Sequence, residues 1–258
     1  MTQAQRRIHL IKYLLAEDSR FRHYVPETMS KQAQKALLRS LMNTRMPVPA
    51  SEAFIRIQDE YLKQEIADKG ITDIVELAPV EKGIFLWQGD ITTLRCDAIV
   101  NAANSQMLGC FVPCHNCIDN CIHTFSGIRL RIKCNEIMKK QGHEEPTGTA
   151  KITPAYNLPC RYILHTVGPI VNGKLTDEHK KLLASCYHSC LKLADKNGLK
   201  SIAFCCISTG VFGFEQKEAA NIAVETVREY KKHSDIQVVF NVFKDDDYNI
   251  YEKILNNK

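Results

Sequence analysis

The sequence has no long apolar run: none of its 258 residues lies in a stretch approaching the roughly 18 consecutive apolar residues that a membrane-spanning helix requires. Residues 1–20 carry charges on both sides of a short apolar stripe and no small-residue cleavage site, which argues against a secretory signal. Internal repeats, low-complexity segments and long Lys/Arg blocks are also absent. These absences exclude a membrane protein and a disordered tail, give no indication of nucleic-acid binding, and predict a cytoplasmic protein.

Cysteine is the residue type in excess. The chain has 11 cysteines, about twice the number that an average composition gives. A cytosolic chain of this size needs no disulfide framework, and the count is odd. The cysteines are therefore either small buried apolar residues or, in part, metal ligands.

The hydrophobic pattern changes near residue 73. Residues 1–72 show apolar residues at helical spacing and predict three helices. The third is expected to begin after Ser51 and to stop at Gly70. Short runs rich in Ile, Val and Phe follow, and they predict strands at 74–80, 84–88, 97–103, 149–156, 161–167, 201–208 and 236–243. Helical segments fall near 118–140, 178–196 and 215–232. This alternation predicts an α/β domain with a parallel or mixed sheet at 73–258, preceded by a helical extension at 1–72.

Three loops follow predicted strands, where ligands bind in such sheets. The loop at 208–214 is rich in glycine, and backbone amides beside a helix start favour an anion; the alternative is a tight strand–helix turn. Phe212 and Phe214 favour a binding site, because exposed aromatic rings usually cover something. Asp90, Asn101 and Asn104 follow other strands and either cap turns or contact a nucleobase and a sugar.

The loop after 97–103 is rich in cysteine and histidine, two residue types that bind metal ions. Within 14 residues the sequence places Cys110, Cys114, His115, Cys117, Cys121 and His123. Thiolates and imidazoles suit tetrahedral zinc, and the lack of a second CxxC favours three protein ligands with an open fourth position. The alternative is a set of core cysteines with a surface histidine. Asp119 either caps the following helix or aligns or deprotonates a group beside the metal.

Five ordered motifs resemble the macrodomain family, an ADP-ribose-binding α/β/α fold. They are GDIT at 89–92, DAIVNAAN at 97–104, CIDNCIH at 117–123, ILHTVGP at 163–169 and STGVFGF at 208–214, and the resemblance spans roughly residues 82 to 243. It implies a three-layer α/β/α fold with a mixed sheet, which here follows an N-terminal helical extension.

The cysteine-rich insertion resembles the zinc-dependent microbial subclass of that family. The subclass pattern GCFxPxHxC implies that Cys110, His115 and Cys117 hold one Zn²⁺ per chain, and it leaves the roles of Cys114 and Cys121 open. Members of the subclass remove mono-ADP-ribose from proteins, and they often accompany a sirtuin-like transferase and a lipoate-carrier protein.

The resemblance also assigns roles along the substrate. Asp119 takes the catalytic aspartate position, with Asn104 beside it at the distal ribose and Asn101 supporting that loop. Phe214 is expected to cover the distal ribose. The expected substrate-binding residues are Asp90 and Ile91 for adenine, Asn101 and Asn104 for ribose, and Ser208, Thr209, Gly210, Val211, Phe212, Gly213 and Phe214 around the diphosphate and ribose.

The sequence thus predicts a zinc-dependent hydrolase that removes mono-ADP-ribose from protein side chains. One alternative is a reader module that binds ADP-ribose without hydrolysing it. A zinc-knuckle nucleic-acid protein is disfavoured, because no basic stripe or exposed aromatic group surrounds the cysteine loop. Zinc either activates a water or polarises the ribose or its bond; the modified side chain, the role of the N-terminal helices and the oligomeric state stay open.

Overall fold

The computed structural model describes residues 1–18 and 24–256, and its first elements are three helices, α1 (Gln3–Glu17), α2 (Lys31–Thr44) and α3 (Glu52–Lys69). A short 3₁₀ turn, η2 (Pro26–Thr28), precedes α2. Ser51 caps α3 through a hydrogen bond from the amide of Phe54, and Gly70 ends it with φ 88°, as predicted from the sequence. The three helices share an apolar core that Ile128 joins from outside the extension.

A mixed seven-stranded sheet forms the centre of the chain, in the order β2-β3-β9-β8-β5-β7-β6. Its strands are β2 (Pro79–Glu81), β3 (Ile84–Gln88), β5 (Ala98–Ala103), β6 (Ala150–Pro154), β7 (Tyr162–Val167), β8 (Ser201–Phe204) and β9 (Gln237–Val242). The five inner strands are parallel, and β2 and β6 run antiparallel at the two edges. A separate parallel pair joins β1 (Thr72–Asp73) to β4 (Leu94–Arg95).

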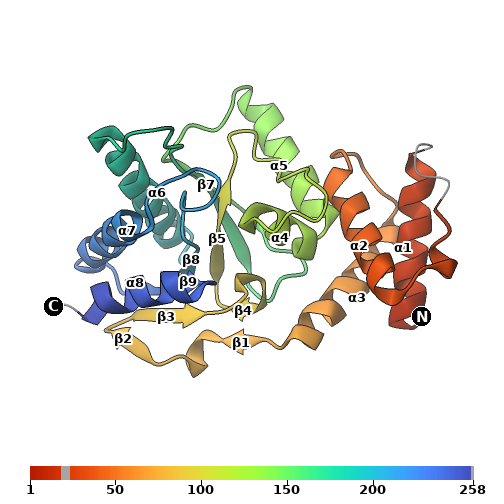
Figure 1. Ribbon diagram of the computed structural model, residues 1–258, viewed down its shortest axis with the longest axis horizontal. Coiled ribbons are helices and arrows are strands. Elements are labelled where there is room, and N and C mark those ends of the chain that lie inside the picture. Colours follow the sequence, from red (N-terminus) through yellow and green to blue (C-terminus); the bar gives the residue numbers. More distant parts are fainter. Residues whose placement is uncertain (19–23, 257–258) are drawn as a thin grey trace.

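Helices cover both faces of this sheet (Figure 1). α6 (Asp177–Lys196), α7 (Gln216–Lys231) and α8 (Asp245–Asn256) pack on one face. α4 (Ile118–Ser126) and α5 (Ile128–Gln141) pack on the other, and α1–α3 lie beyond them. The chain is therefore a three-layer α/β/α structure with an N-terminal group of helices. In the described ranges, no helix has both the length and the apolar character needed to cross a membrane.

Two predicted elements are wrong in detail, and one helix was missed. The run at 74–80 is not one strand: the Asp73 side chain accepts a hydrogen bond from the amide of Val75 and starts a 3₁₀ turn, η3 (Ile74–Glu76), before β2 begins. The helix expected at 118–140 is two helices, because Gly127 at φ 92° breaks it. The final helix α8 was not predicted, since it opens with three aspartates that hide its apolar stripe.

Candidate functional site

The carboxyl ends of the parallel strands meet at one edge of the sheet and bring distant segments together. Asp90 follows β3, Asn104 follows β5, Ser208 lies beyond β8 and Phe243 follows β9. The predicted site residues therefore gather at the edge where α/β folds bind ligands.

Cys110, His115 and Cys117 form a half-buried group whose ligand atoms all lie within 4.8 Å of one another. The Cys110 sulfur is 3.7 Å from Nδ1 of His115. Zinc bonds of about 2.0–2.3 Å in a tetrahedron give ligand–ligand edges of roughly 3.5 Å, so this spacing suits zinc. Two thiols and one imidazole are also the donor types that zinc prefers.

Cys114 and Cys121 do not belong to that group. The Cys114 sulfur lies 3.2 Å from the Ser40 hydroxyl and 3.4 Å from the carbonyl oxygen of Ala36, both on α2. The Cys121 sulfur lies 3.6 Å from the Arg39 guanidinium, also on α2. Both thiols therefore face the N-terminal helices, a role that sequence reasoning missed.

Asp119 lies in the first turn of α4 and does not cap it, because Cys117 is the N-cap. One Asp119 carboxylate oxygen accepts a hydrogen bond of 2.8 Å from the Asn101 amide nitrogen, and the other accepts one of 3.4 Å from Asn104. Only 5% of the residue is exposed. Burial raises the pKa of Asp119 to about 6, although the Asn101 hydrogen bond and the charge of Arg131 lower it. The predicted catalytic pair, Asp119 and Asn104, is thus in contact.

Two buried histidines lie behind Asp119. Asn101 also donates to Nδ1 of His165 at 3.1 Å, which leaves the His165 Nε2 proton for the Thr153 hydroxyl at 2.9 Å. His123 Nε2 is 3.6 Å from Asp119. Burial lowers the pKa of His165 to about 3 and that of His123 well below 6.5, so both rings are neutral near pH 7. His165 was not among the predicted site residues, although it lies in the ILHTVGP motif, and His123 was noted only as one of the histidines and cysteines at 110–123.

The Asp90 carboxylate is held at the far end of the site. Its oxygens accept hydrogen bonds from the backbone and hydroxyl of Thr92, and Lys69 at the end of α3 donates to it at 2.8 Å. Burial alone would raise the pKa of Asp90, but these bonds lower it, so the group is an anionic acceptor. Asp90 caps the 3₁₀ turn η4 (Ile91–Thr93), and the side chain of Ile91 is buried. The side chain of Ile91 is therefore not available to a ligand.

Phe243 is a candidate that sequence reasoning missed. It follows β9 directly, is 74% exposed, and its carbonyl oxygen accepts a hydrogen bond from the Gln88 side chain. Gly89, which precedes Asp90, donates its amide to Val242. An exposed ring beside a carboxylate acceptor suits a planar heterocycle. The signal was present in the sequence as an aromatic residue at a strand end.

The loop at 208–214 presents free backbone donors. Within the described chain, the amides of residues 209–212 donate to no protein acceptor. Ser208 at φ 65° and Gly213 at φ 70° bend the loop, and Gly213 donates to the carbonyl oxygen of Gly210. Consecutive free amides form a concave anion site. Such a site suits an anion, and the diphosphate contact stays a prediction.

Phe214 does not lie open to a ligand. The residue is only 2% exposed and belongs to the core beneath the loop, and its amide donates to the carbonyl oxygen of Ser208. The prediction that it covers the distal ribose therefore disagrees with the structure. Its side chain packs in the core, whereas Phe212 stays partly exposed and Val211 is 82% exposed.

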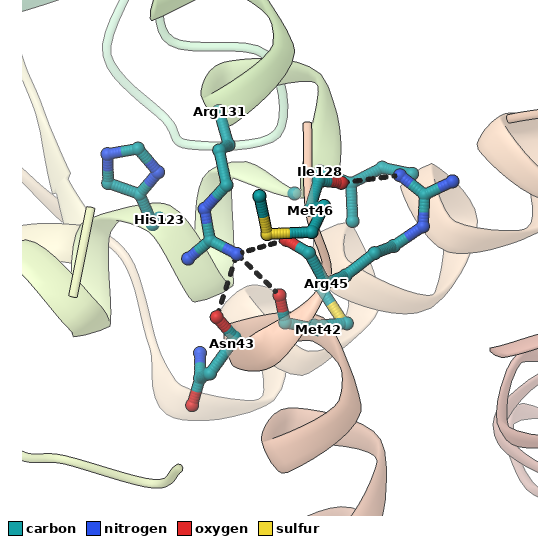
Figure 2. A pocket seen from close by; sticks show the side chains of 8 residues that line it. Met42, Asn43, Arg45, Met46, His123, Ile128 and Arg131 are labelled. Atoms are coloured by element: carbon teal, nitrogen blue, oxygen red, sulfur yellow. Dashed lines mark hydrogen bonds between the residues drawn. The ribbon is translucent and has the colours of Figure 1, made fainter. Parts of the chain in front are cut away.

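A cavity of about 10 Å³ lies beside His123, between α2 and helices α4 and α5 (Figure 2). This space is about that of one water molecule and is far too small for a nucleotide. Arg131 fills the junction and donates to three carbonyl oxygens at and just beyond the end of α2, as the dashed lines in Figure 2 show. The cavity therefore marks an internal contact between the N-terminal helices and the sheet domain.

Comparison with known proteins agrees with this geometry. The Macro domain family model matches residues 100–223. A protein-ADP-ribose hydrolase of Treponema medium is 57% identical over 99% of this chain and 100% of its own length, and one of Staphylococcus aureus (strain MSSA476) is 51% identical over 85% and 84%. A probable bifunctional ADP-ribose hydrolase/ADP-ribosyltransferase of Fusarium oxysporum f. sp. cubense is 41% identical over 93% of this chain and 44% of its own length.

Solved structures give the same result. The Oceanobacillus iheyensis macrodomain with ADP is 38% identical with a TM-score of 0.63, covering 69% of this chain and 93% of that one. The Trypanosoma brucei macrodomain in complex with ADP-ribose is 30% identical with a TM-score of 0.66, covering 90% and 98%. The α/β/α fold with a mixed sheet and N-terminal helices is thereby confirmed, and the chain belongs to the macrodomain family.

Proposed function

We propose that this protein hydrolyses the bond between ADP-ribose and a side chain of a modified protein, with the help of zinc. The observation that carries the proposal is the position of Asp119. Its carboxylate is held by Asn101 and Asn104 two residues after Cys117, a member of the candidate metal group. Relatives that are 51% and 57% identical are named protein-ADP-ribose hydrolase, which supports the same activity here.

Three parts of the site match the three parts of ADP-ribose. Asp90 and the exposed Phe243 suit adenine, since one accepts from an amine and the other offers a flat apolar face. The free amides of residues 209–212 suit the diphosphate. Asn104, close to Asp119, suits the distal ribose hydroxyls. The order of these groups along the sheet edge supports a binding mode in which the distal ribose lies beside Asp119.

Cys110, His115 and Cys117 would hold the zinc, and their donor types and spacing fit it. A zinc ion with an open position supplies Lewis acidity for an oxygen of the substrate or of water. This part of the proposal also rests on the resemblance of the loop to the zinc-dependent microbial subclass.

Hydrolysis breaks the bond from C1 of the distal ribose to the side-chain atom and forms a bond from C1 to a water oxygen. The transition state resembles an oxocarbenium ion, as in glycoside hydrolysis. The Asp119 carboxylate, whose pKa burial raises to about 6, accepts one proton from the attacking water and passes that proton to the departing side chain, while the other hydrogen of the water stays in the new C1 hydroxyl. Asn101 keeps the carboxylate aimed at the site, because it donates to both Asp119 and the neutral His165.

We further propose that the substrate is a lipoate-carrier protein modified by a sirtuin-like transferase. The resemblance to the zinc-dependent subclass supports this choice. The Fusarium relative, whose name joins a hydrolase to an ADP-ribosyltransferase, supports a link between the two activities.

The test is a release assay on ADP-ribosylated lipoate-carrier protein, run with and without chelator, together with metal analysis of the purified protein. Cys117→Ala is expected to abolish zinc binding and release, whereas Cys96→Ala, a buried cysteine preceding β5, is expected to leave both unchanged. Full turnover by the chelated protein or by Cys117→Ala would exclude the zinc requirement. Tight ADP-ribose binding without release, even with zinc, would favour the reader alternative.

A further inference from the structure

We infer that α2 is the positioning element of the metal loop, defined as residues 110–117, and that Arg39 is its central residue. The inference rests on the metal-binding part of the proposed function. It assigns a role to the N-terminal helices, whose sequence gave no chemical reason for their presence.

Arg39 joins α2 to both the metal loop and α4. One of its terminal nitrogens donates to the carbonyl oxygen of His115 at 2.7 Å and to the side-chain oxygen of Asn120 at 3.0 Å. Hydrogen bonds from a guanidinium are about twice as strong as neutral ones. A candidate metal ligand is therefore fixed at its backbone by a charge that comes from the N-terminal helices.

The residue before His115 is held by the same helix. Cys114 has φ 55°, a left-handed conformation that is uncommon for a residue with a Cβ. Its amide donates to the Asn43 side chain at 3.0 Å, and its sulfur lies 3.2 Å from the Ser40 hydroxyl. These contacts with α2 stabilise the bend that turns His115 toward Cys110.

Asn120 extends the support to the other two candidate ligands. Its side-chain nitrogen donates to the carbonyl oxygens of Cys110 at 3.3 Å and Val112 at 2.9 Å, and its own amide donates to the Cys117 sulfur at 3.4 Å. Asn120 is fully buried, and Arg39 is a donor to its side-chain oxygen. All three candidate ligands are therefore tied to one Arg39–Asn120 pair.

The helix that carries Arg39 is itself fixed to the sheet domain. The Asn43 side-chain nitrogen donates to the Thr124 hydroxyl at 2.9 Å, and Arg131 binds the carbonyl oxygens of Met42 and Asn43 (Figure 2). A metal site held by such supporting bonds is preorganised, and loss of one supporting partner typically lowers metal affinity by roughly 10- to 100-fold.

The experiment compares Arg39→Met with Lys35→Met in the full chain. Lys35 lies one turn earlier on α2 and pairs with Glu65 on α3, so it controls for the loss of one α2 charge. Zinc affinity is measured by competition with a chromophoric chelator, and the Co²⁺-loaded proteins are compared by their visible absorption. We expect Arg39→Met to lower zinc affinity by roughly 10- to 100-fold and to change the Co²⁺ spectrum, and Lys35→Met to change neither.

The remaining outcomes separate this inference from the proposed function. A parent protein that binds no zinc would overturn both. Zinc binding by the parent, with unchanged affinity in Arg39→Met, would overturn the positioning role alone; so would a lowered thermal midpoint of the metal-free variant with unchanged zinc affinity. If Arg39→Met does not fold, Arg39→Lys is measured instead, because it keeps the charge but loses the shape of the guanidinium. Its zinc affinity is expected to be lower than that of the parent protein. An affinity equal to that of the parent would overturn the inference.

Discussion

Replacing Arg131 with Met tests how firmly the N-terminal helices are joined to the sheet domain. Arg131 is 5% exposed, and its guanidinium donates to four carbonyl oxygens. The bonds run to Leu108 at 2.7 Å, Met42 at 3.1 Å, Asn43 at 2.7 Å and Arg45 at 2.7 Å. Because the last carbonyls of a helix have no partner within it, Arg131 satisfies acceptors at the end of α2 that would otherwise be buried and unpaired.

The expected cost follows from those four bonds. A methionine fills much of the volume but donates nothing, so the carbonyl oxygens lose a charged donor in a site whose cavity holds at most one water. Hydrogen bonds to charged groups are worth about 1.5–3 kcal/mol each, and removing one partner of a buried charged network costs about 3–5 kcal/mol. We expect the free energy of unfolding to fall by about 3–5 kcal/mol. At roughly 2–4 °C per kcal/mol, the thermal midpoint falls by about 6–20 °C.

Thermal and urea unfolding, followed by circular dichroism, measure this change. The matched control is Lys133→Met on the same helix, because Lys133 is more exposed and pairs with Glu136 of the same helix at 3.1 Å. Exposed ion pairs contribute about 0–1 kcal/mol, so the control is expected to lose about that amount. Equal losses in the two variants, or a loss below about 1 kcal/mol in Arg131→Met, would refute the reasoning.

Three further outcomes are expected. Asp119→Asn removes the proton acceptor and should lower the rate of ADP-ribose release by roughly 10²- to 10⁴-fold; a rate within tenfold of the parent's would contradict its role. Asn104→Ala should weaken ADP-ribose binding by about 1–3 kcal/mol in calorimetry if a buried sugar hydroxyl loses its partner, and unchanged affinity would count against the contact. His165 has a folded pKa of about 3, below its unfolded value, so the unfolded chain binds more protons between about pH 6.5 and 3. Stability from this residue is complete above that window and is lost as the pH falls through it; His165→Gln should flatten the slope by up to about 1.4 kcal/mol per pH unit, and an unchanged slope would refute the assignment.

Much of the fold could be predicted because its elements have strong local signals. The strand at 84–88 is confirmed at both ends, and the boundaries of α3 follow from Ser51 and Gly70. Elements without a local signal were missed. Residues 74–80 have the composition of a strand, but the Asp73 side chain starts a turn there that the composition does not reveal. The helix α8 was missed because its acidic residues make its apolar spacing hard to recognise.

The candidate site divides in the same way. Asp119 and the cysteine-rich loop could be picked out as candidates from residue type and spacing, and the family resemblance then implied the catalytic role of Asp119 and the metal set Cys110, His115 and Cys117. Residues that act by contacting those groups could not, because the contact joins segments far apart in the chain. Arg39 and His115, for example, are separated by more than seventy positions. Phe214 shows the opposite error, since its motif favoured a site role while its packing buried it.

These contacts bear on how the chain divides. The boundary predicted near residue 72 follows the change in hydrophobic period and stays a prediction, but the contacts of the site cross it twice. Lys69 at the end of α3 donates to Asp90, at the end of the site proposed for adenine, and Arg39 on α2 donates to His115, at the end proposed for the metal. The buried Ile128 of α5 completes the core of the N-terminal helices. Because both ends of the candidate site accept hydrogen bonds from residues 1–72, the change of sequence pattern near residue 72 does not divide the chain into a catalytic part and a dispensable one.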